Sequence, residues 1–112
     1  MELLTRPEEY VLLSIWRLAG EAYSVKIRRE IKKISGRQFS LGSVYAPLER
    51  LEKRGLIRST LSESTPERGG RRKRIYSLAP AGMDALREAR RVQESFWAGL
   101  PTSRIAEVED VR

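Results

Sequence analysis

The sequence predicts a mainly α-helical chain with one small β-hairpin and a long C-terminal helix. Three observations support this fold class. Residues 5–55 hold three apolar patterns of helical period, each bounded by a capping residue or a glycine. Residues 56–78 hold two short strand-like runs on either side of a glycine-bearing turn. Residues 80–100 hold a fourth helical pattern, and 112 residues suffice for one domain with a modest core.

The first helix is predicted to begin after Thr5. Threonine is a favoured N-cap, Glu8 completes a capping box, and Pro7 is tolerated in the first turn. The pattern ends at Gly20. Its apolar residues lie at helical spacing and comprise Val11, Leu12, Ile15, Trp16 and Ala19. We expect Trp16 to lie in the core.

The second helix is predicted to run from an N-cap at Ser24 to Gly36. Its buried stripe comprises Ile27, Ile31 and Ile34. The residues between the isoleucines are almost all basic, and Glu30 is the one acid among them. A charge run on a helix is usually its solvated face, but these like charges repel one another and a phosphate backbone would relieve that repulsion.

The third helix is predicted to begin after Ser40 and to end at Gly55, with a stripe of Val44, Leu48 and Leu51 facing the core. Pro47 cannot donate a backbone hydrogen bond, so we expect a local kink. The opposite face is small, polar or basic and carries Ser43, Ala46, Arg50 and Lys53. Such a face suits a groove of nucleic acid, although an ordinary amphipathic surface helix has the same pattern.

A basic hairpin follows the third helix. Residues 56–62 alternate as a strand, residues 63–70 form a polar turn, and residues 71–78 return as a strand that begins Arg71-Arg72-Lys73-Arg74. Three helices followed by a two-stranded basic hairpin is the order of a winged helix-turn-helix. In this fold the hairpin is called the wing.

The fourth helix is predicted to run from Pro80 to about Leu100, ahead of Pro101. Its apolar residues repeat in a near-heptad seam that can cover the first helix of the same chain or a second copy of the protein. We favour the second copy, because the seam is two-sided and the segment is almost neutral. The expected dimer interface comprises Met83, Leu86, Ala89, Val92, Phe96, Trp97 and Leu100. The chain therefore divides into a DNA-binding domain (1–79), a dimerisation helix (80–100) and a tail (101–112) in which Ile105 and Val108 permit a short helix.

Charge is segregated along the chain. The net charge is +7, yet residues 1–80 hold 17 Lys and Arg against 9 Asp and Glu, while residues 81–112 hold 5 against 6. This distribution favours a polyanion as the partner of the first part. The chain has no cysteine, which excludes disulfides, and it also has no histidine. Without either residue, zinc and other transition-metal sites and most nucleophile–base pairs are not expected, and we expect no cofactor and no enzyme activity. No apolar run has membrane-spanning length and no signal-peptide pattern is present, so a cytoplasmic protein without a membrane partner is expected.

Double-stranded DNA is therefore the expected partner. Phosphate contacts are assigned to the second helix and the wing, through Lys26, Arg29, Lys33, Arg37, Arg71, Arg72 and Lys73. Base reading and a phosphate at the helix start are assigned to the third helix, through Ser40, Ser43, Tyr45 and Arg50.

Tyr45 lies at the edge of the apolar stripe, so it is either a core residue or a phosphate contact. Trp16 and Trp97 either stack on a planar ligand or simply pack in the core. The competing functions are a sequence-nonspecific nucleic-acid-binding module and a winged-helix domain that binds only proteins.

Two stretches resemble the PadR-like family of transcriptional regulators. Residues 41–57, which read Leu-Gly-Ser-Val-Tyr-Ala-Pro-Leu-Glu-Arg-Leu-Glu-Lys-Arg-Gly-Leu-Ile, are similar to the family's Gly-Thr-Leu-Tyr-Pro…Leu…Leu-Glu…Gly-Leu-Ile run. Residues 69–78 and Gly82 are similar to its Gly-Arg-x-Arg-Lys-x-Tyr-x-Leu-Thr-x-x-Gly run. The chain departs from the family at Ser24-Val25, which replace Gly-Tyr, at Ala46, which separates Tyr45 from Pro47, and at Ala79, which replaces a capping threonine.

The resemblance covers roughly residues 8–100. It implies a bacterial, cytoplasmic winged-helix homodimer that binds a palindromic operator and usually represses. It also implies that a small aromatic effector can release DNA by binding near the dimer interface, because some relatives respond in this way.

Overall fold

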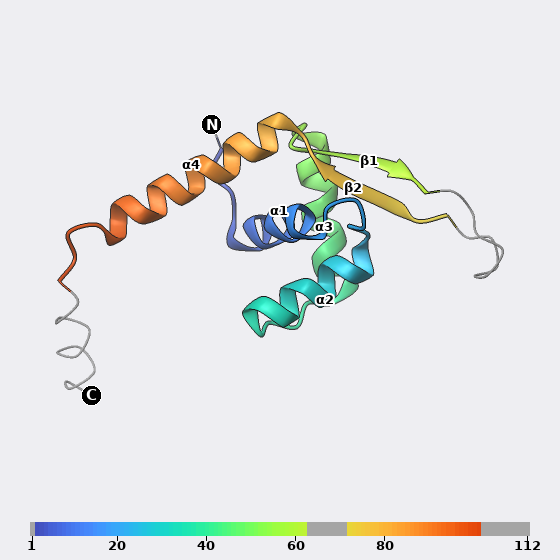
Figure 1. Ribbon diagram of the computed structural model, residues 1–112, viewed down its shortest axis with the longest axis horizontal. Helices are drawn as coiled ribbons and strands as arrows, with labels where there is room; N and C mark the ends of the chain where they lie inside the picture. Colours follow the sequence, from blue (N-terminus) through green and yellow to red (C-terminus); the bar gives the residue numbers. More distant parts are fainter. Residues whose placement is uncertain (1, 63–71, 102–112) are drawn as a thin grey trace.

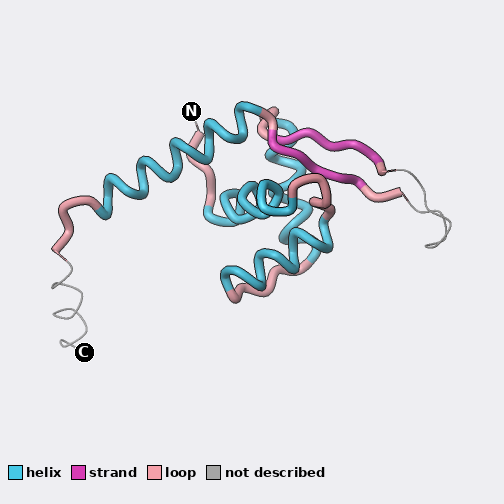
Figure 2. Tube along the Cα trace, in the orientation of Figure 1, coloured by secondary structure: helices cyan, strands magenta, loops and turns pink. Residues whose placement is uncertain are grey.

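Within residues 2–62 and 72–101, which the computed structural model describes, four helices and two strands follow one another along the chain (Figures 1 and 2). They are α1 (Arg6–Leu18), α2 (Ser24–Ser35), α3 (Leu41–Lys53), β1 (Ile57–Leu61), β2 (Arg74–Leu78) and α4 (Pro80–Trp97). This order confirms the predicted winged helix with an additional C-terminal helix. Arg71 at the wing and the tail with Ile105 and Val108 lie outside the described residues.

The helix ends follow the local sequence in most places. Thr5 and Glu8 form the predicted capping box: the Thr5 hydroxyl accepts from the Glu8 N–H at 3.2 Å, and the Glu8 carboxylate accepts from the Thr5 N–H at 2.8 Å. Gly36 ends α2 at φ 75°, a conformation that glycine adopts without strain. The predicted cap of α2 is wrong. Tyr23 occupies the N-cap position without a side-chain cap bond, and Ser24 is the first helical residue.

The core forms where α1, α2 and α3 meet the hairpin. Two predicted core residues are exposed instead: Trp16 and Ile34, each at 58%. Trp16 lies about 100° around the helix from the buried Ile15, so it projects from the outer face of α1. Ile34 lies in the last turn of α2, one turn beyond Ile31, the last buried isoleucine. The buried apolar residues of the cluster are Val11, Leu12, Ile15, Ala22, Ile27, Ile31, Val44, Leu48, Leu51, Leu56, Ile57, Tyr76, Ala85 and Leu86.

The hairpin pairs β1 with β2 in antiparallel orientation, and β2 is also bonded to the connection between α1 and α2. Ile57 lies opposite Leu78, and Leu61 lies opposite Arg74. The other edge of β2 meets the connection between α1 and α2, because the Tyr76 N–H donates to the Ala22 carbonyl at 2.8 Å. The wing is therefore fastened to the connection that precedes α2.

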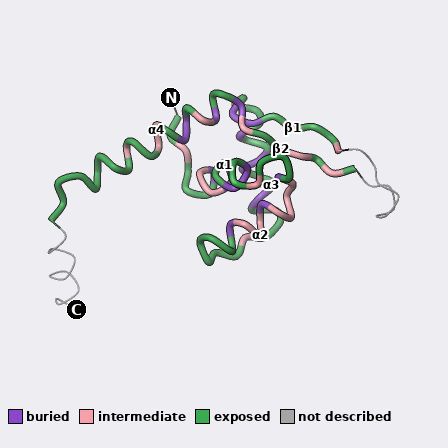
Figure 3. The backbone as a smooth tube through the Cα atoms, in the orientation of Figure 1, coloured by how far each residue is buried: buried purple, intermediate pink, exposed green. Residues whose placement is uncertain are grey.

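The start of α4 rests against the junction of α3 and β1. The Ala79 N–H donates to the Leu56 carbonyl at 3.0 Å, and a Cβ at Gly82 would lie 2.1 Å from that same oxygen. Only glycine allows this close approach. From there α4 leads away from the other helices and becomes exposed along its second half (Figures 1 and 3). It ends at Trp97, three residues before the predicted Leu100.

Within the described residues, none of the helices combines the length and apolar character needed to cross a bilayer.

Candidate nucleic-acid interface

The outward face of α3 is set by the four side chains that it buries. Val44, Pro47, Leu48 and Leu51 face the core. α3 is a single helix that continues through Pro47. At about 100° per residue, the positions opposite this stripe are Gly42, Ala46, Glu49 and Lys53, and all four are exposed. We call these four residues the outward face.

The start of α3 is held by two serines. The Ser40 hydroxyl accepts from the Ser43 N–H at 3.1 Å and lies 2.9 Å from the Ser43 hydroxyl. Both residues are exposed, so the helix begins on the protein surface. Such a start suits a phosphate oxygen.

Tyr45 connects α3 to α2. Its hydroxyl lies 3.1 Å from the Ser24 hydroxyl at the first position of α2, and its side chain is half exposed. The residue is therefore not buried in the core, and its hydroxyl remains at the surface beside the start of α2.

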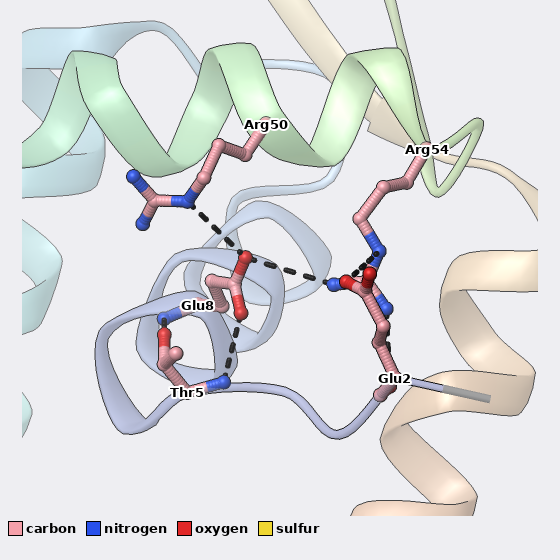
Figure 4. Close-up of polar contacts among 5 residues, drawn as sticks. All are labelled: Glu2, Thr5, Glu8, Arg50 and Arg54. Carbon is pink, nitrogen blue, oxygen red and sulfur yellow. Dashed lines mark hydrogen bonds and ion pairs between the residues drawn. The ribbon is translucent and has the colours of Figure 1, made fainter.

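Arg50 of α3 and Arg54 at its C-cap both reach toward Glu8 of α1 (Figure 4), although the Arg50 side chain remains 53% exposed. The buried Glu8 carboxylate lies 3.5 Å from the Arg50 Nε and 3.6 Å from the Arg54 guanidinium. Arg54 also reaches Glu2 in the N-terminal segment. Sequence reasoning proposed Arg50 for base reading. The structure places it on the flank of α3, beside an acid whose role in sequence was only that of a capping residue.

The charge state of Glu8 follows from these partners. Burial by itself would raise the pKa of Glu8, but hydrogen bonds with Thr5 and the positive charges of Arg54 and Arg50 outweigh it, so the pKa lies below its ordinary value. Glu8 is therefore ionised at neutral pH and pairs with both arginines.

The predicted phosphate-binding cations of α2 are mostly accessible. Arg29, Lys33 and Arg37 are exposed, whereas Lys26 is partly covered and pairs with Glu21 at 3.4 Å. Glu30, the acid among them, pairs with Arg17 of α1 at 2.8 Å. The hydrogen bond from Arg17 lowers the pKa of Glu30. Glu30 also lies 4.0 Å from the Lys33 ammonium, so this acid is shared between Arg17 of α1 and one of the predicted phosphate-binding cations.

At the wing, Arg72 is exposed, but Lys73 is partly covered. The Lys73 ammonium lies 3.9 Å from the centre of the Tyr23 ring, which is a cation–π contact. Arg74 donates to the Ser59 hydroxyl across the hairpin at 2.9 Å. Sequence reasoning missed Tyr23, because a tyrosine in a connection carries no signal of the strand that lies beside it.

The connection before α2 brings these elements together. Ala22 contacts Tyr76 of β2, Tyr23 contacts Lys73 just before β2, and Ser24 contacts Tyr45 of α3. The wing, the start of α2 and the first turns of α3 therefore meet around three consecutive residues. A basic wing beside an exposed helix start is an arrangement that suits a phosphate backbone and a groove.

The second half of α4 carries an apolar stripe that its own chain does not cover. Ala85 and Leu86 are buried in the core, Ala89 and Val92 are half-buried, and Phe96 is 76% exposed. Leu86 was predicted to face a second copy, but it packs against its own chain. The other predicted interface residues that remain accessible are Met83, Trp97 and Leu100.

The polar side of α4 is formed by local ion pairs. Arg90 pairs with Glu94 at 2.8 Å, and Arg91 pairs with Glu88 at 2.6 Å. Trp16 and Trp97, the two proposed ligand-stacking residues, are exposed on α1 and at the end of α4. The charged side of α4 is therefore satisfied within the chain, whereas its apolar side is left open.

Comparison with known proteins decides the family. The model of the transcriptional regulator PadR-like family matches residues 12–88, which include α2, α3, the hairpin and the first half of α4. The chain belongs to the PadR-like family. Its members are transcriptional regulators that bind DNA, and they are not enzymes.

Solved structures share the fold of this PadR-like chain. A transcriptional regulator from Clostridium thermocellum aligns over 80% of this chain and 82% of its own, with a TM-score of 0.68 and 21% identity. A PadR family regulator from Clostridium difficile R20291 aligns over 95% and 96%, with a TM-score of 0.63 and 24% identity. BpsR from Bordetella bronchiseptica, whose DNA binding is regulated by 6-hydroxynicotinic acid, aligns over 97% and 77%, with a TM-score of 0.59 and 24% identity. No curated protein matched the sequence.

Proposed function

We propose that this PadR-like regulator is a cytoplasmic homodimer that represses transcription by binding a palindromic operator. The observation that carries the proposal is the meeting of the wing, α2 and α3 around residues 22–24. Ala22 contacts β2, Tyr23 contacts Lys73 and Ser24 contacts Tyr45, and these contacts support a single basic surface shared by α2, α3 and the wing. In this arrangement the cations hold phosphates while α3 enters the major groove.

The dimer is supported by α4. Phe96, Trp97 and Leu100 are large apolar side chains that are more than half exposed, and they lie beyond the part of α4 that packs on its own core. Burying one such side chain contributes about 1.5–3 kcal/mol. A second α4 of the same kind is a self-complementary partner, and a two-fold axis would place two α3 helices about one DNA turn apart.

The test is selection of bound duplexes from a random DNA pool by the full chain. We expect an enriched inverted repeat. A sequence-nonspecific nucleic-acid-binding module would retain DNA without enriching a motif, and a domain that binds only proteins would retain none. Either of these results would contradict the proposal. A reporter driven by the recovered repeat should then lose expression when the protein is present, because an occupied operator excludes polymerase.

Release by a small aromatic molecule is the second part of the proposal. BpsR supplies the precedent, and Trp16 and Trp97 are the exposed residues that offer stacking surfaces here. Titration of planar aromatic acids should quench tryptophan fluorescence and reduce binding to the selected repeat. Trp97→Leu should abolish the response, and an equal response from this variant would remove Trp97 from the ligand site.

A further inference from the structure

The outward face of α3 is short of side chains that can read a base. Gly42 and Ala46, in its first two turns, carry no hydrogen-bonding side chain, so this part of the helix can approach the bases closely. The arginines of the flank, Arg50 and Arg54, lie beside Glu8 (Figure 4). The most frequent specific contact in the major groove is an arginine or a lysine on guanine. Among the four residues of the outward face, Lys53 alone has such a side chain; it lies at the end of α3, and its ammonium lies 3.3 Å from the Glu49 carboxylate.

Glu49 is the long side chain nearest to the small residues on that face. Its side chain is 70% exposed, and its carboxylate lies 3.3 Å from the Lys53 ammonium, four residues further along the helix. Lys53 reduces the negative charge that the carboxylate would bring near the phosphates. The carboxylate nevertheless keeps oxygen positions that can accept hydrogen bonds from another donor.

An ionised carboxylate can only accept hydrogen bonds, which limits the bases that it can contact. In the major groove, guanine presents two acceptors that would repel it, whereas cytosine presents the N4 amino group as a donor. Adenine presents an amino group beside an acceptor, so it is the weaker match. A carboxylate on the outward face thus favours cytosine and disfavours guanine at the position it reaches.

We propose that Glu49 is a specificity-determining residue that selects the exocyclic amino group of a cytosine in each half of the operator. The inference rests on the proposed function and deepens it, because it assigns a base class to α3. It also explains how a strongly basic protein tolerates an acid on the surface that meets DNA.

The experiment repeats the selection from a random pool with the wild-type chain, Glu49→Gln and Glu52→Gln. The two substitutions remove one negative charge each from the same helix. Glu52 is the matched control, because its carboxylate accepts from the Ser59 hydroxyl of β1 at 2.5 Å and so faces the hairpin. We expect the wild-type chain and Glu52→Gln to recover a cytosine at one position of each half-site. Glu49→Gln should relax that position, because an amide also donates and pairs well with adenine.

Competition binding with duplexes that differ only at this position measures the effect. The preference for cytosine over guanine should fall about tenfold in Glu49→Gln and stay unchanged in Glu52→Gln. If both variants bind more tightly by the same factor and keep the wild-type preference, Glu49 acts only through charge and the inference is wrong. If the wild-type chain recovers no repeat at all, the proposed function fails and the inference fails with it. Thermal melting of each variant establishes that the exposed substitution at Glu49 leaves the fold intact.

Discussion

The ammonium of Lys73 lies 3.9 Å from the centre of the Tyr23 ring, and this contact joins the residue that precedes β2, at the outer end of the paired strands, to the residue that precedes α2. Its neighbours extend the connection. Ala22 accepts a backbone hydrogen bond from Tyr76 of β2, and Ser24 meets the hydroxyl of Tyr45 on α3. The wing and α3 are therefore held to the same short connection, so the spacing between them is set by the protein before DNA arrives.

Replacing the aromatic ring of Tyr23 should loosen the wing while the positive charges of the wing remain. We expect Tyr23→Leu to weaken binding to the selected operator severalfold, since an exposed cation–π contact contributes about 0.5–1 kcal/mol and the wing also loses its orientation. The slope of log affinity against log salt should stay near the wild-type value in Tyr23→Leu and fall in Lys73→Gln. Fluorescence anisotropy across a salt series measures both quantities, and a lower slope in Tyr23→Leu would contradict this role.

The buried acid beside the arginines should matter for stability. Glu8→Gln keeps the size of the side chain but loses the charge that faces Arg50 and Arg54, and we expect a loss of about 1–3 kcal/mol in the free energy of unfolding. Glu9→Gln is the control. Its partner Arg6 is exposed and lies 3.9 Å away, so a change below about 0.5 kcal/mol is expected. Urea unfolding measures the free energy of unfolding of both variants. Equal losses in the two variants would show that the arginine pairs of Glu8 do not stabilise the fold.

Acid should destabilise the fold through the same residue. The pKa of Glu8 is lower in the folded chain than its ordinary value of 4.5, because the hydrogen bonds with Thr5 and the arginine charges outweigh the effect of burial. Glu30 is shifted in the same direction by Arg17. Their contribution is present above the unfolded-state pKa and is lost as pH falls through the folded-state value. Unfolding free energy should be level near neutral pH and should decline below about pH 5. In Glu8→Gln the decline should be shallower, and an unchanged pH profile would contradict the assignment.

The exposed end of α4 should determine the oligomeric state. Phe96→Asp places a charge on the apolar stripe, so we expect a monomer with weakened operator binding, because two linked half-sites bind more tightly than one. Ser95→Asp introduces the same charge on the polar side of α4 and should leave the dimer intact. Sedimentation velocity distinguishes the two variants. A wild-type chain that sediments as a monomer would refute the dimer.

The arginines at the wing should supply phosphate contacts. We expect Arg71→Ala together with Arg72→Ala to weaken operator binding severalfold and to reduce the salt slope by about one for each lost phosphate contact. Arg87→Ala together with Arg90→Ala is a matched charge control, because both arginines are exposed on α4 and pair there with Asp84 at 3.5 Å and Glu94 at 2.8 Å. Unchanged affinity and slope in the double variant would exclude these arginines from DNA binding.

Local patterns were sufficient for most of the fold. The capping box at Thr5, the glycine at position 36 and the serine cap at position 40 each act through hydrogen bonds or backbone angles within a few residues, so their outcome follows from neighbouring sequence. Two helix ends differ from the prediction, at the N-cap of α2 and the end of α4. The other failed predictions concern burial. Trp16 and Ile34 are apolar residues at helical spacing, yet whether a helix face is covered depends on the elements packed beside it.

The sequence by itself therefore determined the order of the helices and strands, the stripe of α3 that faces the core and the segregation of charge, because each depends on local spacing and composition. Only the tertiary structure decided which exposed side chains are free to meet a partner. Glu8 lies 42 positions before Arg50, and their pairing exists only because α1 and α3 pack together. That pairing directs Arg50 toward α1. Long-range contacts of this kind have no periodicity that a sequence pattern can reveal.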